Sequence, residues 1–134
     1  MNKSFKKYLI YISVIGLLAA GCSNNSNVLT PFVEMNYRNV AYESLSEQSK
    51  ATVINWQDGK VEKGIYQKKN GSNIILLDSG SQIGFVFNTS NVEVINGQRL
   101  IMVTFNTKDD PLLGPMILII DPITNKVIGG VQRE

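Results

Sequence analysis

Hydrophobic residues follow three different patterns along this chain of 134 residues. An almost continuous apolar run covers residues 8–20, and a polar stretch follows it. Between residues 31 and 45 the apolar positions recur at spacings of three to five, which favours an amphipathic helix. After residue 52 they gather in short runs separated by Gly, Asn and Asp, which is typical of strands joined by tight turns.

The helical part of the pattern carries capping signals at two places. Pro31 fits the first turn of a helix, and Thr30 before it is a suitable N-cap. Ser44 is followed three residues later by Glu47, which is the spacing of a capping box. We therefore predict a second short helix from about Ser44 to Ala51, with a plain polar turn as the alternative.

Turn residues divide the remainder of the chain into predicted strands. Asp58-Gly59 is expected to close a first hairpin between residues 52–56 and 60–67. Asn70-Gly71 marks a further turn, and Asn125 suits a left-handed position in the last one. The predicted strands cover residues 52–56, 60–67, 73–77, 83–87, 92–95, 98–105, 116–120 and 126–131.

The clearest hairpin signal is Asn96-Gly97, because Asn-Gly between two apolar runs is the preferred type I′ turn. This turn would join residues 92–95 to the strand that follows. In that register Val92 and Val94 share a face with Ile101. Both faces of the ribbon are apolar, so we expect it to be covered on both sides.

Helices followed by a run of strands predict an α+β fold. We expect the N-terminal helical segment to pack on a largely antiparallel sheet of about five to seven strands. Residues 31–134 would form this single domain.

The N-terminal segment has the layout of a secretory signal. Lys3, Lys6 and Lys7 precede the apolar run, and no acidic residue accompanies them. The run over 8–20 is too short for the roughly 20 residues that a membrane-spanning helix needs. We therefore interpret residues 1–21 as a signal peptide.

The small residues that end this run precede the only cysteine of the chain. The sequence Ala19-Ala20-Gly21-Cys22 resembles the lipobox of bacterial lipoproteins, with alanine at the position where leucine is usual. The resemblance implies cleavage between Gly21 and Cys22 and a diacylglyceryl group on the Cys22 thiol. Two acyl chains are enough for stable membrane anchoring.

Other interpretations of the N-terminal segment remain open. Small residues also precede ordinary secretory cleavage sites, and the segment could be retained as an uncleaved anchor. On each interpretation the domain lies outside the cytoplasm. On the lipobox interpretation, residues 22–30 are the lipidated cysteine and a polar, flexible tether.

The last strands resemble a known family. An apolar strand, Asp121, a turn over 124–126 and then Val127 are similar to the end of PepSY and related cystatin-like extracytoplasmic domains. The whole layout also resembles small lipoproteins of low-GC Gram-positive bacteria. These resemblances imply a binding or regulatory module on the outer face of the cell membrane of a Gram-positive bacterium.

The charge of the expected mature chain excludes one class of partner. The full chain carries 13 Lys+Arg and 11 Asp+Glu. Three of the lysines belong to the signal segment, so the mature chain would carry a net charge of −1. We therefore expect no nucleic-acid partner. The expected partners are the membrane, through the N-terminal lipid, and an envelope protein.

The residue inventory disfavours an enzyme. The chain contains no histidine, and lipidation would consume its single thiol. Ser-His and Cys-His nucleophiles and the usual ligands of zinc, haem and iron–sulfur clusters are therefore missing. We expect no catalytic residue, no metal and no cofactor. Asn106, Asp109 and Asp110 could contribute to a weak Ca²⁺ site, but their spacing does not match an EF-hand loop, and adjacent acids beside a proline are more typical of a solvated turn.

One loop is the candidate for partner binding. Its apolar residues lie among turn formers, and the candidate residues are Pro111, Leu112, Leu113 and Pro115. The loop could expose a docking tip, but we favour the alternative that it folds back and plugs the sheet. We interpret Trp56 as a core residue. The leading functional hypothesis is a non-catalytic binding or regulatory module of the cell envelope, and the alternative is a small carboxylate-dependent cell-wall hydrolase.

Overall fold

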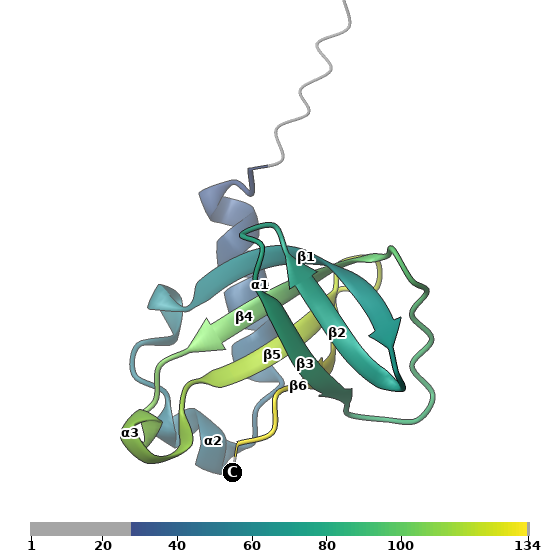
Figure 1. Ribbon diagram of the computed structural model, residues 1–134. Helices are drawn as coiled ribbons and strands as arrows, with labels where there is room; N and C mark the ends of the chain where they lie inside the picture. Colours follow the sequence, from purple (N-terminus) through teal and green to yellow (C-terminus); the bar gives the residue numbers. More distant parts are fainter. Residues whose placement is uncertain (1–27, 134) are drawn as a thin grey trace, which may run out of the picture.

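The computed structural model describes residues 28–133 (Figure 1). Two helices and a 3₁₀ turn come first, followed by six strands with a short helix between the fourth and the fifth. The elements are α1 (Pro31–Glu43), α2 (Glu47–Thr52), η1 (Trp56–Asp58), β1 (Lys60–Lys69), β2 (Ser72–Leu77), β3 (Gln82–Phe87), β4 (Arg99–Phe105), α3 (Asp110–Leu113), β5 (Met116–Asp121) and β6 (Lys126–Gly130).

The six strands are antiparallel and close into a barrel with the order β1-β2-β3-β6-β5-β4. The α+β class and the number of strands are confirmed, whereas closure was not predicted. Closure needs β3 to pair with β6, and these strands share two residue pairs, Val86 with Gly130 and Phe87 with Gly129. A Cβ on Gly129 would overlap the carbonyl oxygen of Val86, so glycine permits the close approach that seals the barrel.

One apolar cluster fills the barrel interior. All six strands contribute to it, and where a strand contributes more than one residue these lie at alternate positions, as expected when side chains point to opposite faces of a sheet. Tyr66, Phe85 and Phe87 form an aromatic group within it, with ring centroids 5.2–6.1 Å apart. The buried members of the cluster are Tyr66, Ile75, Leu77, Phe85, Leu100, Met102, Ile119 and Ile128.

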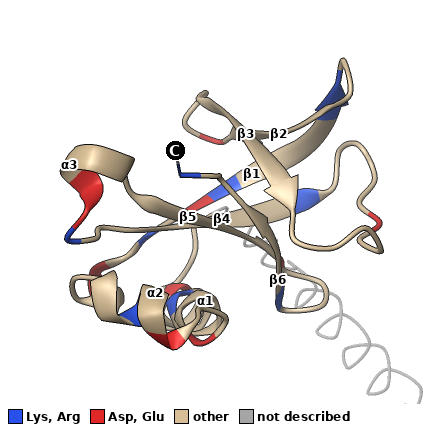
Figure 2. Ribbon diagram, turned by 90° about the horizontal axis from the view of Figure 1, so that it is seen from below, with Lys and Arg blue, Asp and Glu red and all other residues tan. Residues whose placement is uncertain are grey.

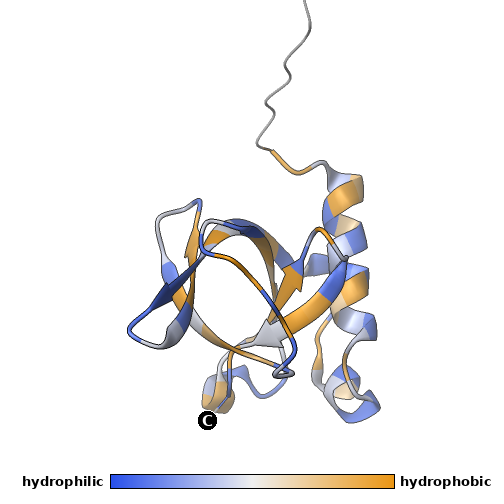
Figure 3. Cartoon of the chain, turned by 90° about the vertical axis from the view of Figure 1, so that its right-hand side faces the viewer, coloured by the Kyte–Doolittle hydropathy of each residue, from blue (hydrophilic) through white to orange (hydrophobic). Residues whose placement is uncertain are grey.

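A second apolar cluster lies between α1 and the outer surface of the barrel. Helix α1 contacts β4, β5, β6 and β1, and Figure 3 shows it beside the ring of strands. Tyr42 of α1 stacks on Trp56 at 5.4 Å between ring centroids and meets the edge of Phe105 at 6.4 Å. Trp56 is partly buried and packs against this cluster, which agrees with its interpretation as a core residue. The buried members are Ala41, Ile101, Val103, Phe105 and Ile120.

Several local expectations are confirmed. The Thr30 hydroxyl caps α1 by accepting a hydrogen bond from the amide of Val33, and Pro31 occupies the first turn. Asn70 and Gly71 both have positive φ between β1 and β2, as a type I′ turn requires. Asn125, with φ 55°, is also in the left-handed region.

The second helix begins later than predicted. Ser44 ends α1, with its hydroxyl donating to the carbonyl of Ala41 at 2.6 Å. Ser46 is the N-cap of α2 and accepts from the amide of Ser49. Lys50 joins the two helices by hydrogen bonds to Glu43 and Glu47, and the bond to Glu43 raises the pKa of the lysine above its usual value.

The first predicted hairpin is wrong. Residues 53–55 form one isolated bridge, between Val53 and Thr107, instead of a strand. Asn55 has a positive φ of 43°, which turns the chain into η1 and brings Trp56 against α1. Burial of the indole on Tyr42 therefore replaces the expected strand pairing.

Asn96 and Gly97 form a turn, as predicted, in which the Gln98 amide donates to the Ile95 carbonyl at 3.0 Å. The hairpin predicted around this turn is wrong, although β4 is covered on both sides as expected. β4 pairs with β1 and β5, and the Gly97 amide donates to the Tyr66 carbonyl, so β1 occupies the edge that residues 92–95 would need. Val92 and Val94 instead pack on the interior cluster, on the face opposite Ile101.

The tight pairing of β1 with β2 predicts different tolerance at two strand glycines. A Cβ on Gly64 would lie 2.6 Å from Ile75 Cγ1 and 2.7 Å from the Leu76 carbonyl oxygen, whereas the nearest atom to a Cβ on Gly84 is 3.9 Å away. Gly64→Ala should lower the free energy of unfolding by about 1–3 kcal/mol. Gly84→Ala should leave it unchanged or raise it by about 0.5–1 kcal/mol. Urea unfolding followed by Trp56 fluorescence measures both, and equal effects would contradict the assigned register.

Candidate functional site

The candidate docking loop forms an exposed tip. We call Pro111, Leu112, Leu113 and Pro115 the α3 tip, since α3 carries the first three of these residues. Leu112 is 87% exposed and Leu113 is 43% exposed. The interpretation that this loop plugs the sheet is therefore wrong. Two adjacent exposed leucines between two prolines form a small apolar projection from the barrel.

Partly buried hydrogen bonds hold the base of the tip. Oδ1 of Asp110 accepts from the amide of Thr107 at 2.8 Å and from its hydroxyl at 2.7 Å. The Arg133 guanidinium donates to the Thr107 hydroxyl at 2.7 Å and lies 3.8 Å from Asp110. Thr107 is buried. We call these three residues the Asp110 network.

Backbone hydrogen bonds fix the same loop to the end of α2. The Ile54 amide donates to the Asn106 carbonyl at 2.9 Å, and the Lys108 amide donates to the Thr52 carbonyl at 3.0 Å. The Asp109 carbonyl accepts from the amides of Leu112 and Leu113. The exposed leucines of the α3 tip are therefore carried by a backbone that is fixed by hydrogen bonds, both to the end of α2 and within α3.

The suggested Ca²⁺ ligands are not arranged as a site. Asp110 is occupied by Thr107 and Arg133, and the side chain of Asp109 makes no capping hydrogen bond to α3. Within residues 28–133 no group of three or more His, Cys, Asp or Glu side chains could hold a metal ion.

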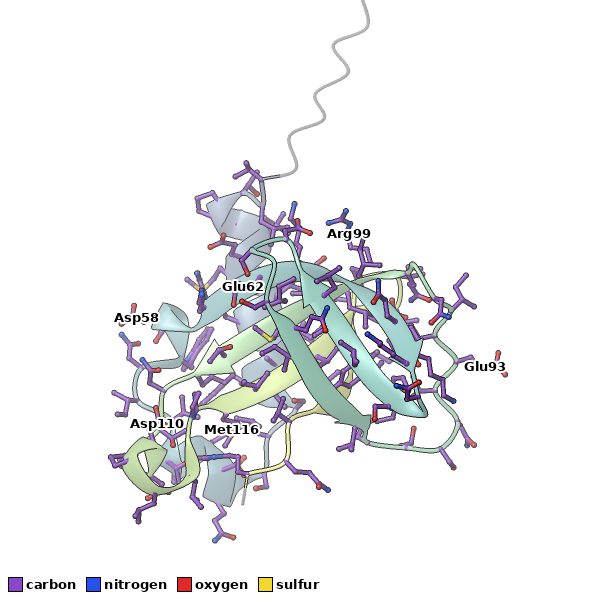
Figure 4. All side chains as sticks on the ribbon, viewed as in Figure 1. Asp58, Glu62, Glu93, Arg99, Asp110 and Met116 are labelled. Atoms are coloured by element: carbon purple, nitrogen blue, oxygen red, sulfur yellow. The ribbon has the colours of Figure 1, made fainter. Side chains whose placement is uncertain are left out.

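The other acidic residues are spread over the molecule, and those that come close together are paired with cations, as Glu43 and Glu47 are with Lys50. Figure 2 shows them distributed over separate helices, strands and turns, and Figure 4 places Asp58 and Glu93 on opposite sides of the molecule. Asp121 is buried and stabilises its own turn, accepting from the Ile123 amide at 2.9 Å and the Thr124 hydroxyl at 3.2 Å.

Two hollows on the surface differ in charge. One, of about 570 Å³, lies between α1 and β6, and Lys126 is the only charged residue among those that line it. The other, of about 270 Å³, is lined by three acidic residues, each paired with a cation. These pairs are Glu34 with Arg38 at 2.9 Å, Glu62 with Lys60 at 3.1 Å, and Asp78 with Arg99 at 3.3 Å.

The predicted lipidation and cleavage residues, Cys22 and Gly21, lie outside the described residues. Within the described part of the chain, no helix is both long enough and apolar enough to cross a bilayer. Comparison of the chain with protein-family models, curated proteins and solved structures returned no match.

Sequence reasoning missed Thr107 and Arg133. The Thr107–Asp110 spacing of three residues is that of a local side-chain-to-backbone motif and could have been recognised. Arg133 lies 26 residues from Thr107, and no local signal joins the two. Their contact follows from β6, which directs the C-terminal segment toward α3.

The Asp110 network predicts that two neighbouring acids differ in importance. Asp110→Ala removes the acceptor of a buried amide and of Arg133, and should lower the free energy of unfolding by about 1–3 kcal/mol. Asp109→Ala is the matched control and should change it by less than about 0.5 kcal/mol. Urea unfolding of the two variants gives the comparison. A cost at Asp109 equal to that at Asp110 would show that the network does not hold the tip.

Proposed function

We propose that this chain is a membrane-anchored extracytoplasmic lipoprotein whose barrel domain is a non-catalytic binding or regulatory module of the cell envelope. The α3 tip is its proposed docking surface. The observation that carries the proposal is the geometry of Leu112, which is almost fully exposed on a backbone held by the Asp110 network.

A fixed apolar tip suits protein recognition. An exposed leucine has a favourable free energy of burial, and a pre-ordered backbone reduces the entropy lost on binding. The prolines on either side further restrict the loop. The tip is small, so the partner that fits it is an envelope protein with an apolar pocket that admits one or two leucine side chains.

The placement of the acids supports a binding role over the hydrolase alternative. Carboxylate-dependent glycosidases hold two acids about 5–10 Å apart on either side of the bond they cleave. Here the hollow beside α1 and β6 has no acidic lining residue, and each acid that lines the smaller hollow is neutralised by a cation.

The proposed lipid anchor rests on the amino-acid sequence alone. Cys22 precedes the first described residue, Val28, by six positions. Lipid on Cys22 would place the domain close to the outer surface of the cell membrane, with the tip available to a neighbouring protein.

Photo-crosslinking in membranes tests the docking surface. A benzoylphenylalanine at position 112 of the full chain should give a discrete adduct of higher mass. Excess wild-type protein should compete for the partner, and Leu112→Asp protein should not. Ile123, 80% exposed in the β5–β6 turn, is the control position and should give no adduct.

The anchor is tested in parallel by the intact mass of the extracted protein and of a Cys22→Ser variant. The wild type should begin at Cys22 and carry acyl chains, and the variant should carry none. An unmodified chain would contradict the lipoprotein assignment. Equal crosslinking from positions 112 and 123, or none, would contradict the docking assignment alone.

A further inference from the structure

The first turn of α1 exposes large apolar side chains at one end of the molecule. Phe32 is 84% exposed and Val28 is 78% exposed, and Met35 follows one turn later at 38%. Single exposed apolar residues are common on proteins, but Phe32 and Met35 lie in the first turns of α1 and Val28 lies three residues before it. They form what we call the α1 apolar end.

The polarity of the outward side of α1 changes along its length. Phe32 and Met35 line a shallow hollow with Asn36, Asn39 and Trp56. Further along, Glu43 is exposed and paired with Lys50. The outward side of α1 is thus apolar at its beginning and polar or charged at its end.

The chain between this end and the proposed anchor is short. Only residues 23–27 separate Cys22 from Val28, so the two lie within about 20 Å of each other even when that segment is fully extended. We propose that the α1 apolar end inserts into the headgroup region of the membrane that holds the anchor, with Phe32 as the deepest side chain. This inference rests on the proposed lipidation of Cys22.

The charges near the α1 apolar end favour an anionic lipid surface. Val28 shares a hollow with Lys63 and with three acids, of which Glu34 and Glu62 are each paired with one cation. Asp78 is the single carboxylate for two cations, since Arg99 lies 3.3 Å and Lys63 lies 4.0 Å from its Oδ2. Figure 4 shows Arg99 toward the end at which α1 begins. These two cations and one carboxylate carry a net charge of +1, which complements anionic headgroups.

A lipid surface fits this patch better than a second protein does. A stable protein interface buries about 1,200–2,000 Å² in total, and three side chains supply only part of one face of it. A membrane contact needs no such area here, because the acyl chains already hold the domain at the surface.

Insertion of this end would orient the whole molecule. Figure 1 shows α1 beginning at the top of the molecule and α3 at the bottom, close to the C-terminus. Because α1 packs along the barrel, a membrane contact at Phe32 would point the α3 tip away from the bilayer. The docking surface would then face the extracellular space.

Quenching by brominated lipids tests the orientation in the full lipidated chain. Tryptophan is placed at position 32 by Phe32→Trp, or at the equally exposed control position by Leu112→Trp, in a Trp56→Phe background. Both proteins are reconstituted into vesicles of phosphatidylglycerol and brominated phosphatidylcholine. The tryptophan at position 32 should lose most of its emission, and the one at position 112 should lose little. If Trp56→Phe lowers stability, Trp56 is retained and quenching beyond that of the wild type is measured.

The outcomes separate this inference from the proposed function. If acyl chains are present by intact mass and neither position is quenched, the membrane contact is wrong and the anchor stands. Blue-shifted but unquenched emission at position 32 would mean that protein covers Phe32, which also overturns the contact. Equal quenching at both positions would show that the domain has no preferred orientation. A mass without acyl chains would overturn the anchor and the inference together.

Discussion

The burial of β4 on both faces is the constraint on which the rest of the structure depends. Leu100 and Met102 point into the barrel, whereas Ile101 and Val103 lie under α1. One strand therefore belongs to both apolar clusters, and removing either would expose half of it to water. The pairing of β4 with β1 closes one side of the barrel, and the β4–β5 pairing continues it.

This shared strand connects the proposed membrane contact at the start of α1 with the proposed docking surface at the α3 tip. Helix α1 is fixed to the outer side of β4, so the position of its first turn follows from that packing. The α3 tip follows β4 directly in the chain and is held at its base by Thr107. The distance and direction from the proposed membrane contact to the proposed docking surface are thus properties of one packed unit.

The features that could be predicted from the sequence are those that depend on residues close together in the chain. Proline and threonine at the start of α1, Asn70-Gly71 and the left-handed Asn125 all act within a few residues, and the structure confirms each. Barrel closure could not be predicted, because it depends on Gly129 and on a pairing between strands far apart in the chain. The Asn96-Gly97 hairpin failed for a related reason, since β1 pairs with the strand edge that a local hairpin would use. At the candidate site, the residues of the α3 tip could be proposed from the sequence, because apolar residues lie there among turn formers. Arg133 could not, because its contact is made only by the folded chain.

Native-state hydrogen exchange of the full chain tests most directly whether α1 and β4 are one cooperative unit. Amides in the second half of α1, from Tyr37 to Glu43, should exchange through the same opening as those of β4. Their free energies of exchange and denaturant dependence should agree, because Ala41 and Tyr42 pack on the same cluster as Ile101 and Phe105. Exchange of these α1 amides through a smaller opening, with β4 still protected, would show that the helix detaches alone. The proposed membrane contact and the proposed docking surface would then not be rigidly connected.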